Sequence, residues 1–98
     1  DIDIFYKALR RIHVFNQLSE VRQRVLLNMA FNLGMPRLRL FKNMWAALEA
    51  QDYKEAAKEM LDSDWHRDFL RYAREAGMND QSTRSYELAQ NMRLNKDN

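Results

Sequence analysis

An apolar stretch from Val25 to Leu33 that ends at a glycine leaves few folds open to this chain. Apolar side chains occupy nearly every face of a helix drawn through this stretch, and such a helix belongs inside a core. Ser19 precedes it and can cap its first turn through the hydroxyl. Gly34 can adopt the left-handed conformation that ends a helix, and Pro36 blocks continuation. We therefore predict a central buried helix around which the other elements fold.

The rest of the sequence favours an all-α domain. The chain has 98 residues, of which 46% are apolar, with two glycines, one proline and a net charge of +2. This length suits a single helical domain over residues 1–98 and is too short for two independent cores. The lack of cysteine excludes disulfides and thiolate catalysis. No apolar run approaches the roughly 20 residues that a membrane helix needs, so we expect a soluble protein.

Apolar residues recur at helical spacing in the other segments too, and period-two alternation does not persist. We predict a compact bundle of about six short helices, with a connector at 13–18, a corner at 37–39 and fraying from Leu94 onward. The segment Asp62-Ser63-Asp64 is predicted as a helix break and N-cap, and Ser82 as a helix cap. An aromatic series, ending with Tyr72, is expected to point inward as core. The predicted helices cover 5–12, 20–33, 41–48, 53–61, 65–76 and 82–92.

No motif in the sequence states a reaction mechanism by itself. Glu55, Glu59 and Asp62 follow helical spacing along one side of a helix, which could serve a metal or an acid–base pair. A solvated acidic face beside Lys54 and Lys58 is the favoured interpretation. No histidine pair has the spacing of metal ligands, so we expect no metal site.

Two groups of polar residues allow more than one interpretation. Asn28 and Asn32 lie one turn apart on the most apolar helix, where an amide needs hydrogen-bond partners. They either bond inside the core or line a cleft, and both interpretations stay open. A group of arginines in the first half could contact nucleic acid, but acids are interleaved with them, which favours a solvated surface. These are Arg10, Arg11, Arg22, Arg24, Arg37 and Arg39.

The segment from Arg22 to Gly34 resembles the central helix of the phage-type lysozymes, the endolysins of the bacteriophage T-four kind (glycoside hydrolase family 24). In that family the helix ends in a Phe-Asn/Gln-aliphatic-Gly pattern. Phe41 follows at the family's spacing, and Tyr53 to Ala57 is similar to its Trp/Tyr-x-Glu-Ala-Ala segment. Ser63 to Trp65 stands where the family has Ser-x-Trp. The resemblance spans roughly Ser19 to Trp65, and the flanks match poorly.

The resemblance implies a lobe of a two-lobed enzyme. In the family, a smaller N-terminal lobe carries a catalytic glutamate, an aspartate or equivalent, and a threonine, while the helical lobe forms the other wall of the cleft. The first helix of this chain would come after those positions. We therefore expect the N-terminal catalytic lobe to be absent here, with no catalytic residue in this stretch.

Carried over residue by residue, the resemblance predicts five substrate-binding positions. Phe31 and Asn32 would lie at the cleft, and Gly34 would let the backbone turn beside it. Met44 and Glu59 fall where the family has substrate contacts, but both depart from its pattern. Met44 replaces a hydroxyl-bearing residue and Glu59 an amide, which puts hydrogen bonds to N-acetyl sugars there in doubt.

The resemblance further implies a peptidoglycan muramidase that cuts the MurNAc–GlcNAc β-1,4 bond, with this lobe inactive alone. The expected partners are a glycan strand and the N-terminal lobe, and the apolar surface facing that lobe could also pair two copies. We expect no cofactor, nucleic acid or membrane. A phage endolysin would reside in the host cytoplasm before release to the cell wall.

Two other functions compete with this one. The first is a non-catalytic helical binding module that shares the lobe's core. The second is nucleic-acid binding through the arginines, which would weaken steeply with salt.

Overall fold

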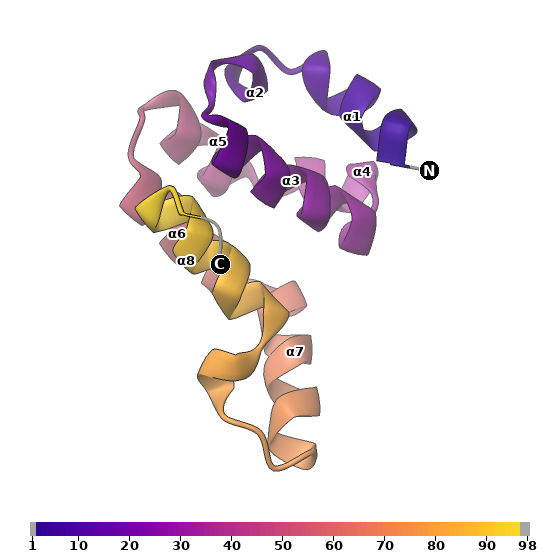
Figure 1. Cartoon of the computed structure of the whole chain (residues 1–98), viewed down its shortest axis with the longest axis vertical. Helices are drawn as coiled ribbons and strands as arrows, with labels where there is room; N and C mark the ends of the chain where they lie inside the picture. Colours follow the sequence, from indigo (N-terminus) through magenta and orange to yellow (C-terminus); the bar gives the residue numbers. More distant parts are fainter. Residues whose placement is uncertain (1, 97–98) are drawn as a thin grey trace.

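The computed structural model describes residues 2–96, which form eight α-helices, one short 3-10 helix and no strand (Figure 1). This confirms the predicted all-α class. None of the described helices is long and apolar enough to cross a membrane. The elements are α1 (Ile2–Arg10), α2 (His13–Gln17), α3 (Glu20–Leu33), α4 (Met35–Arg39), α5 (Lys42–Glu49), α6 (Tyr53–Leu61), α7 (Asp64–Glu75), η1 (Asp80–Ser82) and α8 (Arg84–Leu94).

The last helix joins the two ends of an elongated molecule of 40 × 28 × 24 Å. α8 packs against α3, α6 and α7, while α5 packs against α6 and α1 against α3. In Figure 1, α1, α2 and α3 gather toward the top, and α7 extends to the bottom beyond the crossing of α6 and α8. The middle of the bundle is therefore shared between α3 and α8.

α3 is buried along one side. Its exposed side carries Phe31 and Asn32, and Phe31 is 63% exposed. Burying one large apolar side chain contributes about 1.5–3 kcal/mol, so the inner side anchors the helix firmly. Its inner residues, each at most 2% exposed, are Val25, Leu26, Met29 and Ala30.

Both ends of α3 form largely as their residues predict. The Ser19 hydroxyl accepts a hydrogen bond from the Arg22 backbone N–H at 3.2 Å, which confirms the cap. Gly34 has the predicted positive φ of 82°, but its ψ of 153° is extended and not left-handed helical. A side chain is strained in this conformation, whereas glycine is not. The chain therefore turns at once into α4, whose first turn accommodates Pro36.

Several local predictions were wrong. The predicted connector contains the five-residue helix α2, whose Phe15 is fully buried, and the predicted corner is the helix α4, held by the fully buried Leu38. Ser82 does not cap α8. The cap is Thr83, whose hydroxyl accepts from the Tyr86 backbone N–H at 3.2 Å. Burial of single apolar residues in one-turn segments gives too weak a period to be seen in sequence.

The later helices otherwise begin where expected. Within the predicted cap segment 62–64, it is Ser63 that caps α7 by accepting from the His66 backbone N–H at 3.2 Å. Tyr72 was predicted to point into the core, but it is 69% exposed. Of the residues predicted to fray, Leu94 is the last helical residue of α8, Asn95 ends the helix in the left-handed conformation, and 97–98 lie outside the described residues.

The core contains several flexible thioether side chains. Four methionines from four different helices are at most 1% exposed, whereas Met78 is 46% exposed. Methionine fills irregular gaps between helices that cross at varied angles, which suits a bundle of short helices. The buried ones are Met29, Met44, Met60 and Met92.

Candidate functional site

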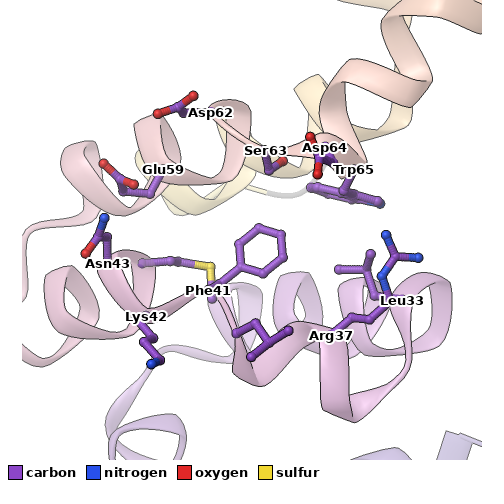
Figure 2. Close-up of a pocket in the computed structure, with 12 residues that line it drawn as sticks. Leu33, Arg37, Phe41, Lys42, Asn43, Glu59, Asp62, Ser63, Asp64 and Trp65 are labelled. Atoms are coloured by element: carbon purple, nitrogen blue, oxygen red, sulfur yellow. The ribbon is translucent and has the colours of Figure 1, made fainter.

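A cleft of about 300 Å³ opens where the end of α6 and the start of α7 face α4 and α5 (Figure 2). The turn at 40–41 separates α4 from α5, and the loop at 62–63 separates α6 from α7. The long side chains on the two walls of the cleft come from these two pairs of helices. Figure 2 shows Glu59 and Asp62 on one side, Lys42 and Asn43 on the other, and the Phe41 ring between them. Its lining residues are Leu33, Arg37, Leu40, Phe41, Lys42, Asn43, Met44, Glu59, Asp62, Ser63, Asp64 and Trp65.

The two walls of the cleft differ in charge. Arg37 and Lys42 lie on the α4–α5 wall, and the opposite wall carries the carboxylates. Arg67 binds Asp62 at 3.3 Å and Asp64 at 3.1 Å, and these hydrogen bonds raise the pKa of its guanidinium. Both aspartates are largely exposed. Such a cleft can offer donors on one side and acceptors on the other to a neutral polar ligand.

Trp65 closes one end of the cleft. Its ring meets Phe41 and Phe69 edge to face, with centroids 6.5 and 5.9 Å away, and the residue is 6% exposed. This confirms its expected place in the core. Its buried Nε1 has no hydrogen-bond partner among residues 2–96, whereas Nε1 of Trp45 donates to the Leu38 carbonyl at 3.0 Å. A buried donor without an acceptor costs about 1–3 kcal/mol.

A second hollow of about 470 Å³, which we call the side hollow, adjoins the cleft. Leu33, Arg37 and Trp65 line both, and we call the two adjoining hollows together the groove. The remaining lining residues of the side hollow are Asn32, Asp68, Phe69 and Tyr72. The groove therefore runs along α3, α4 and α5 on one side and α6 and α7 on the other.

The structure brings three of the five predicted binding residues to this groove. Asn32 lines the side hollow, and Met44 and Glu59 line the cleft. Phe31 lines neither, since its ring packs edge to face on Phe5 at 5.9 Å. Gly34 lines neither hollow and acts only through the turn between α3 and α4.

Neither asparagine is buried in the core, and each borders a hollow. Asn28 donates to the Arg24 carbonyl at 2.9 Å and accepts from the Arg84 guanidinium at 3.2 Å, in a small hollow of about 120 Å³. Asn32 is exposed and donates to the Asn28 carbonyl at 2.8 Å. Each amide is thus bonded locally and also borders a hollow.

The three acids of α6 and its end do not form one site. Glu59 and Asp62 line the cleft, but Glu55 lines a different hollow between α6 and α8. Within residues 2–96, no group of three or more His, Asp or Glu side chains is arranged to hold a metal ion.

Sequence reasoning missed several groove residues. Lys42, Asn43 and Asp68 occupy polar helix positions that look like ordinary surface, and nothing in their spacing marks them. Asp64 was seen only as part of a helix break. Tyr72 had the only usable signal, an aromatic in a strongly charged segment, and it was assigned to the core instead.

A buried polar cluster lies directly after Trp65. Nδ1 of His66 is 2.7 Å from the hydroxyl of Ser85, which is fully buried and donates to the Thr83 hydroxyl at 3.4 Å. This cluster fastens α7 to the start of α8.

The geometry defines a helical module with an open, polar groove. A protein of Dictyostelium discoideum described as "Probable T4-type lysozyme 1" is 32% identical to this chain over 53 residues. The match covers 54% of this chain and 31% of that protein, so this chain spans about a third of its relative. No family model and no solved structure matches. These findings support a lysozyme-like relationship for the module.

Proposed function

We propose that this chain is the helical, substrate-cleft lobe of a peptidoglycan-hydrolysing lysozyme. The parent enzyme would cut the MurNAc–GlcNAc β-1,4 bond, and its catalytic carboxylates would lie outside this chain. The observation that carries the proposal is the groove. The resemblance assigns substrate contacts to Asn32, Met44 and Glu59, which come from three helices, and these residues line the cleft and the side hollow next to it.

The chemistry of the groove supports a sugar ligand. Amide, carboxylate and guanidinium groups on its walls can exchange hydrogen bonds with hydroxyl and N-acetyl groups. Met44 is 1% exposed and gives the cleft an apolar floor. A few polar groups around an apolar surface are typical of small-molecule and glycan sites.

Two of the three carboxylates that line the cleft, Asp62 and Asp64, do not suit glycosidic bond cleavage. A glycosidase acid is placed in an apolar, water-poor setting that keeps its proton. Asp62 and Asp64 are instead exposed and held by Arg67. We therefore propose that this chain binds the glycan strand and that the N-terminal lobe supplies the acid and base. Before release to the cell wall, a phage enzyme of this kind would remain in the host cytoplasm.

The test is binding of soluble muropeptides to the purified chain, measured by calorimetry and by shifts of backbone amide signals. We expect weak binding that shifts the signals of Asn43 and Glu59, and no release of soluble fragments from cell-wall sacculi. Absence of binding to any muropeptide contradicts the proposal. Release of fragments by this chain alone contradicts the assignment of catalysis to another lobe.

A matched pair of variants examines the departure at Glu59. Glu59→Gln supplies an amide donor and removes a charge from the cleft, and one added hydrogen bond of about 0.5–1.5 kcal/mol should tighten binding roughly 2- to 10-fold. Glu55→Gln makes the same change one turn earlier, outside the groove. Equal effects of the two variants would show that Glu59 does not contact the sugar.

A further inference from the structure

Tyr72 is an exposed aromatic residue on the wall of the side hollow. The residue is 69% exposed, although it follows the helical spacing of the buried Trp65 and the half-buried Phe69. Phe69 packs on Trp65 and leaves Tyr72 outside this stack. A large aromatic held at the edge of a hollow provides a flat apolar surface that a ligand can cover.

The groups around Tyr72 fit one face and the rim of a sugar ring. A pyranose presents C–H groups on its faces and hydroxyl groups around its edge, so it needs an aromatic surface with hydrogen-bonding groups beside it. Asn32, Arg37 and Asp68 supply an amide, a guanidinium and a carboxylate at this hollow. Asp68 accepts from Arg71 at 3.1 Å through Oδ1, and a carboxylate has further lone pairs.

The side hollow also adjoins the cleft. Leu33, Arg37 and Trp65 line both hollows, so a sugar bound in one would lie next to a sugar bound in the other. We propose that Tyr72 and the side hollow form an additional subsite, which binds sugar units of the glycan strand beyond those in the cleft. This inference rests on the proposed function and adds a second contact region to it.

The subsite predicts that affinity depends on glycan length. Soluble muropeptides with one disaccharide unit and with two or more units are titrated into the full chain. Tyr72→Ala should weaken binding of the longer fragments about 3- to 10-fold, because it removes one aromatic contact, and should leave the shortest fragment unchanged. Tyr72→Phe keeps the ring and should retain most of the affinity.

Tyr6→Ala is the matched control. Tyr6 is also an exposed aromatic, at 40%, but it lies on α1 and packs on Phe15. It should leave the affinity for both fragment lengths unchanged. Fragments stripped of their stem peptides should still respond to Tyr72→Ala, and a response that needs the peptide would assign Tyr72 to the stem and overturn the sugar subsite.

The outcomes separate this inference from the proposed function. If the wild-type chain binds fragments and Tyr72→Ala binds each length as tightly as the wild type does, the subsite proposal is wrong. The proposed binding of glycan in the cleft is then unaffected. If the wild-type chain binds neither length, both proposals fail. If sedimentation shows a dimer that Tyr72→Ala dissociates, the occupant of the hollow is a second copy and the sugar subsite is overturned.

Discussion

His66 is the only buried ionisable side chain among residues 3–96. Burial lowers its pKa below the ordinary histidine value, Asp80 opposes this effect, and Arg67 and Arg74 add to it. The unfolded chain therefore takes up a proton at a higher pH than the folded chain does. It follows that the stability contributed by neutral His66 is complete above the ordinary value of about 6.5 and is lost as the pH falls below it.

Replacing His66 should remove this part of the pH dependence. We expect His66→Gln to flatten the decrease in the free energy of unfolding between about pH 7.5 and 5.5, because an amide does not titrate. Urea denaturation at several pH values measures this slope. His13→Gln is the control, since His13 is exposed and its ring Nε2 lies 3.3 Å from the amide nitrogen of Gln17 on the surface. A wild-type slope in His66→Gln would mean that another group titrates.

At the scale of single residues, the sequence predicted less of the site than of the fold. Asn32 and Glu59 could be placed at the groove because their neighbours repeat a family pattern in order along the chain. Phe31 follows the same pattern, but its ring packs on α1, which no local spacing reveals. Tyr72 was misplaced because helical spacing gives the side of a helix but not how far the neighbouring helices extend over it.

At the scale of elements, the start of α8 provides a direct test of capping. Thr83→Ala removes the acceptor of the Tyr86 backbone N–H and the hydroxyl that donates to the Asp80 carbonyl at 3.0 Å. Loss of an N-cap costs about 0.5–2 kcal/mol, so we expect a loss of about 1 kcal/mol in the free energy of unfolding. Urea denaturation followed by circular dichroism measures it.

Ser82→Ala is the matched control for this prediction. Ser82 is the cap that sequence spacing suggests, but it is exposed and ends the 3-10 helix η1. Its replacement should change stability by less than about 0.5 kcal/mol, as is usual for surface positions. A larger loss for Ser82→Ala than for Thr83→Ala would place the cap one residue earlier.

Helices of eight residues or more were predictable, whereas the one-turn elements were not. α3, α5, α6 and α7 each repeat their apolar positions over two turns or more, and Ser19 and Ser63 mark two of the starts. α2 and α4 have five residues each, which is too short for a period to be counted. They are held by long-range burial of Phe15 and Leu38, which depends on the whole fold.

At the scale of the whole molecule, Arg22 connects the beginning of α3 to the end of α8. Its guanidinium stacks 3.6 Å from the centre of the Tyr53 ring, and its Nε donates to the Met92 carbonyl at 2.7 Å. A second nitrogen donates to the Arg93 carbonyl at 3.3 Å. Carbonyls at a helix end lack partners within the helix, so this contact completes α8 as it joins distant parts of the chain.

Arg22→Lys should therefore destabilise the whole molecule despite keeping the charge. An ammonium lacks the planar fork and stacks less well, so we expect a loss of about 1–3 kcal/mol in the free energy of unfolding. Arg24→Lys is the control, because Arg24 forms a surface ion pair with Glu20 that should be worth less than about 1 kcal/mol. Thermal or urea denaturation measures both variants. Equal losses of unfolding free energy in Arg22→Lys and Arg24→Lys would contradict the proposed role of Arg22 in joining the two helices.

The overall class could be read from the sequence, but the way in which the helices meet could not. The apolar character of Val25 to Leu33 indicated a central helix, and one side of that helix is indeed buried. α8 also lies at the centre of the bundle, and its position depends on contacts such as the hydrogen bond between Arg22 and the Met92 carbonyl, 70 positions apart in the chain. Pairings at such separations leave no periodic signal in a single sequence.

The methionine-rich core has a consequence for the behaviour of the protein toward oxidants. Conversion of a thioether to a sulfoxide turns an apolar group into a polar one, which a packed core does not tolerate. In the folded molecule an oxidant reaches the exposed Met78 first, while the four core sulfurs stay shielded. The rate of oxidation of those four buried methionines would therefore report how often the helical bundle opens.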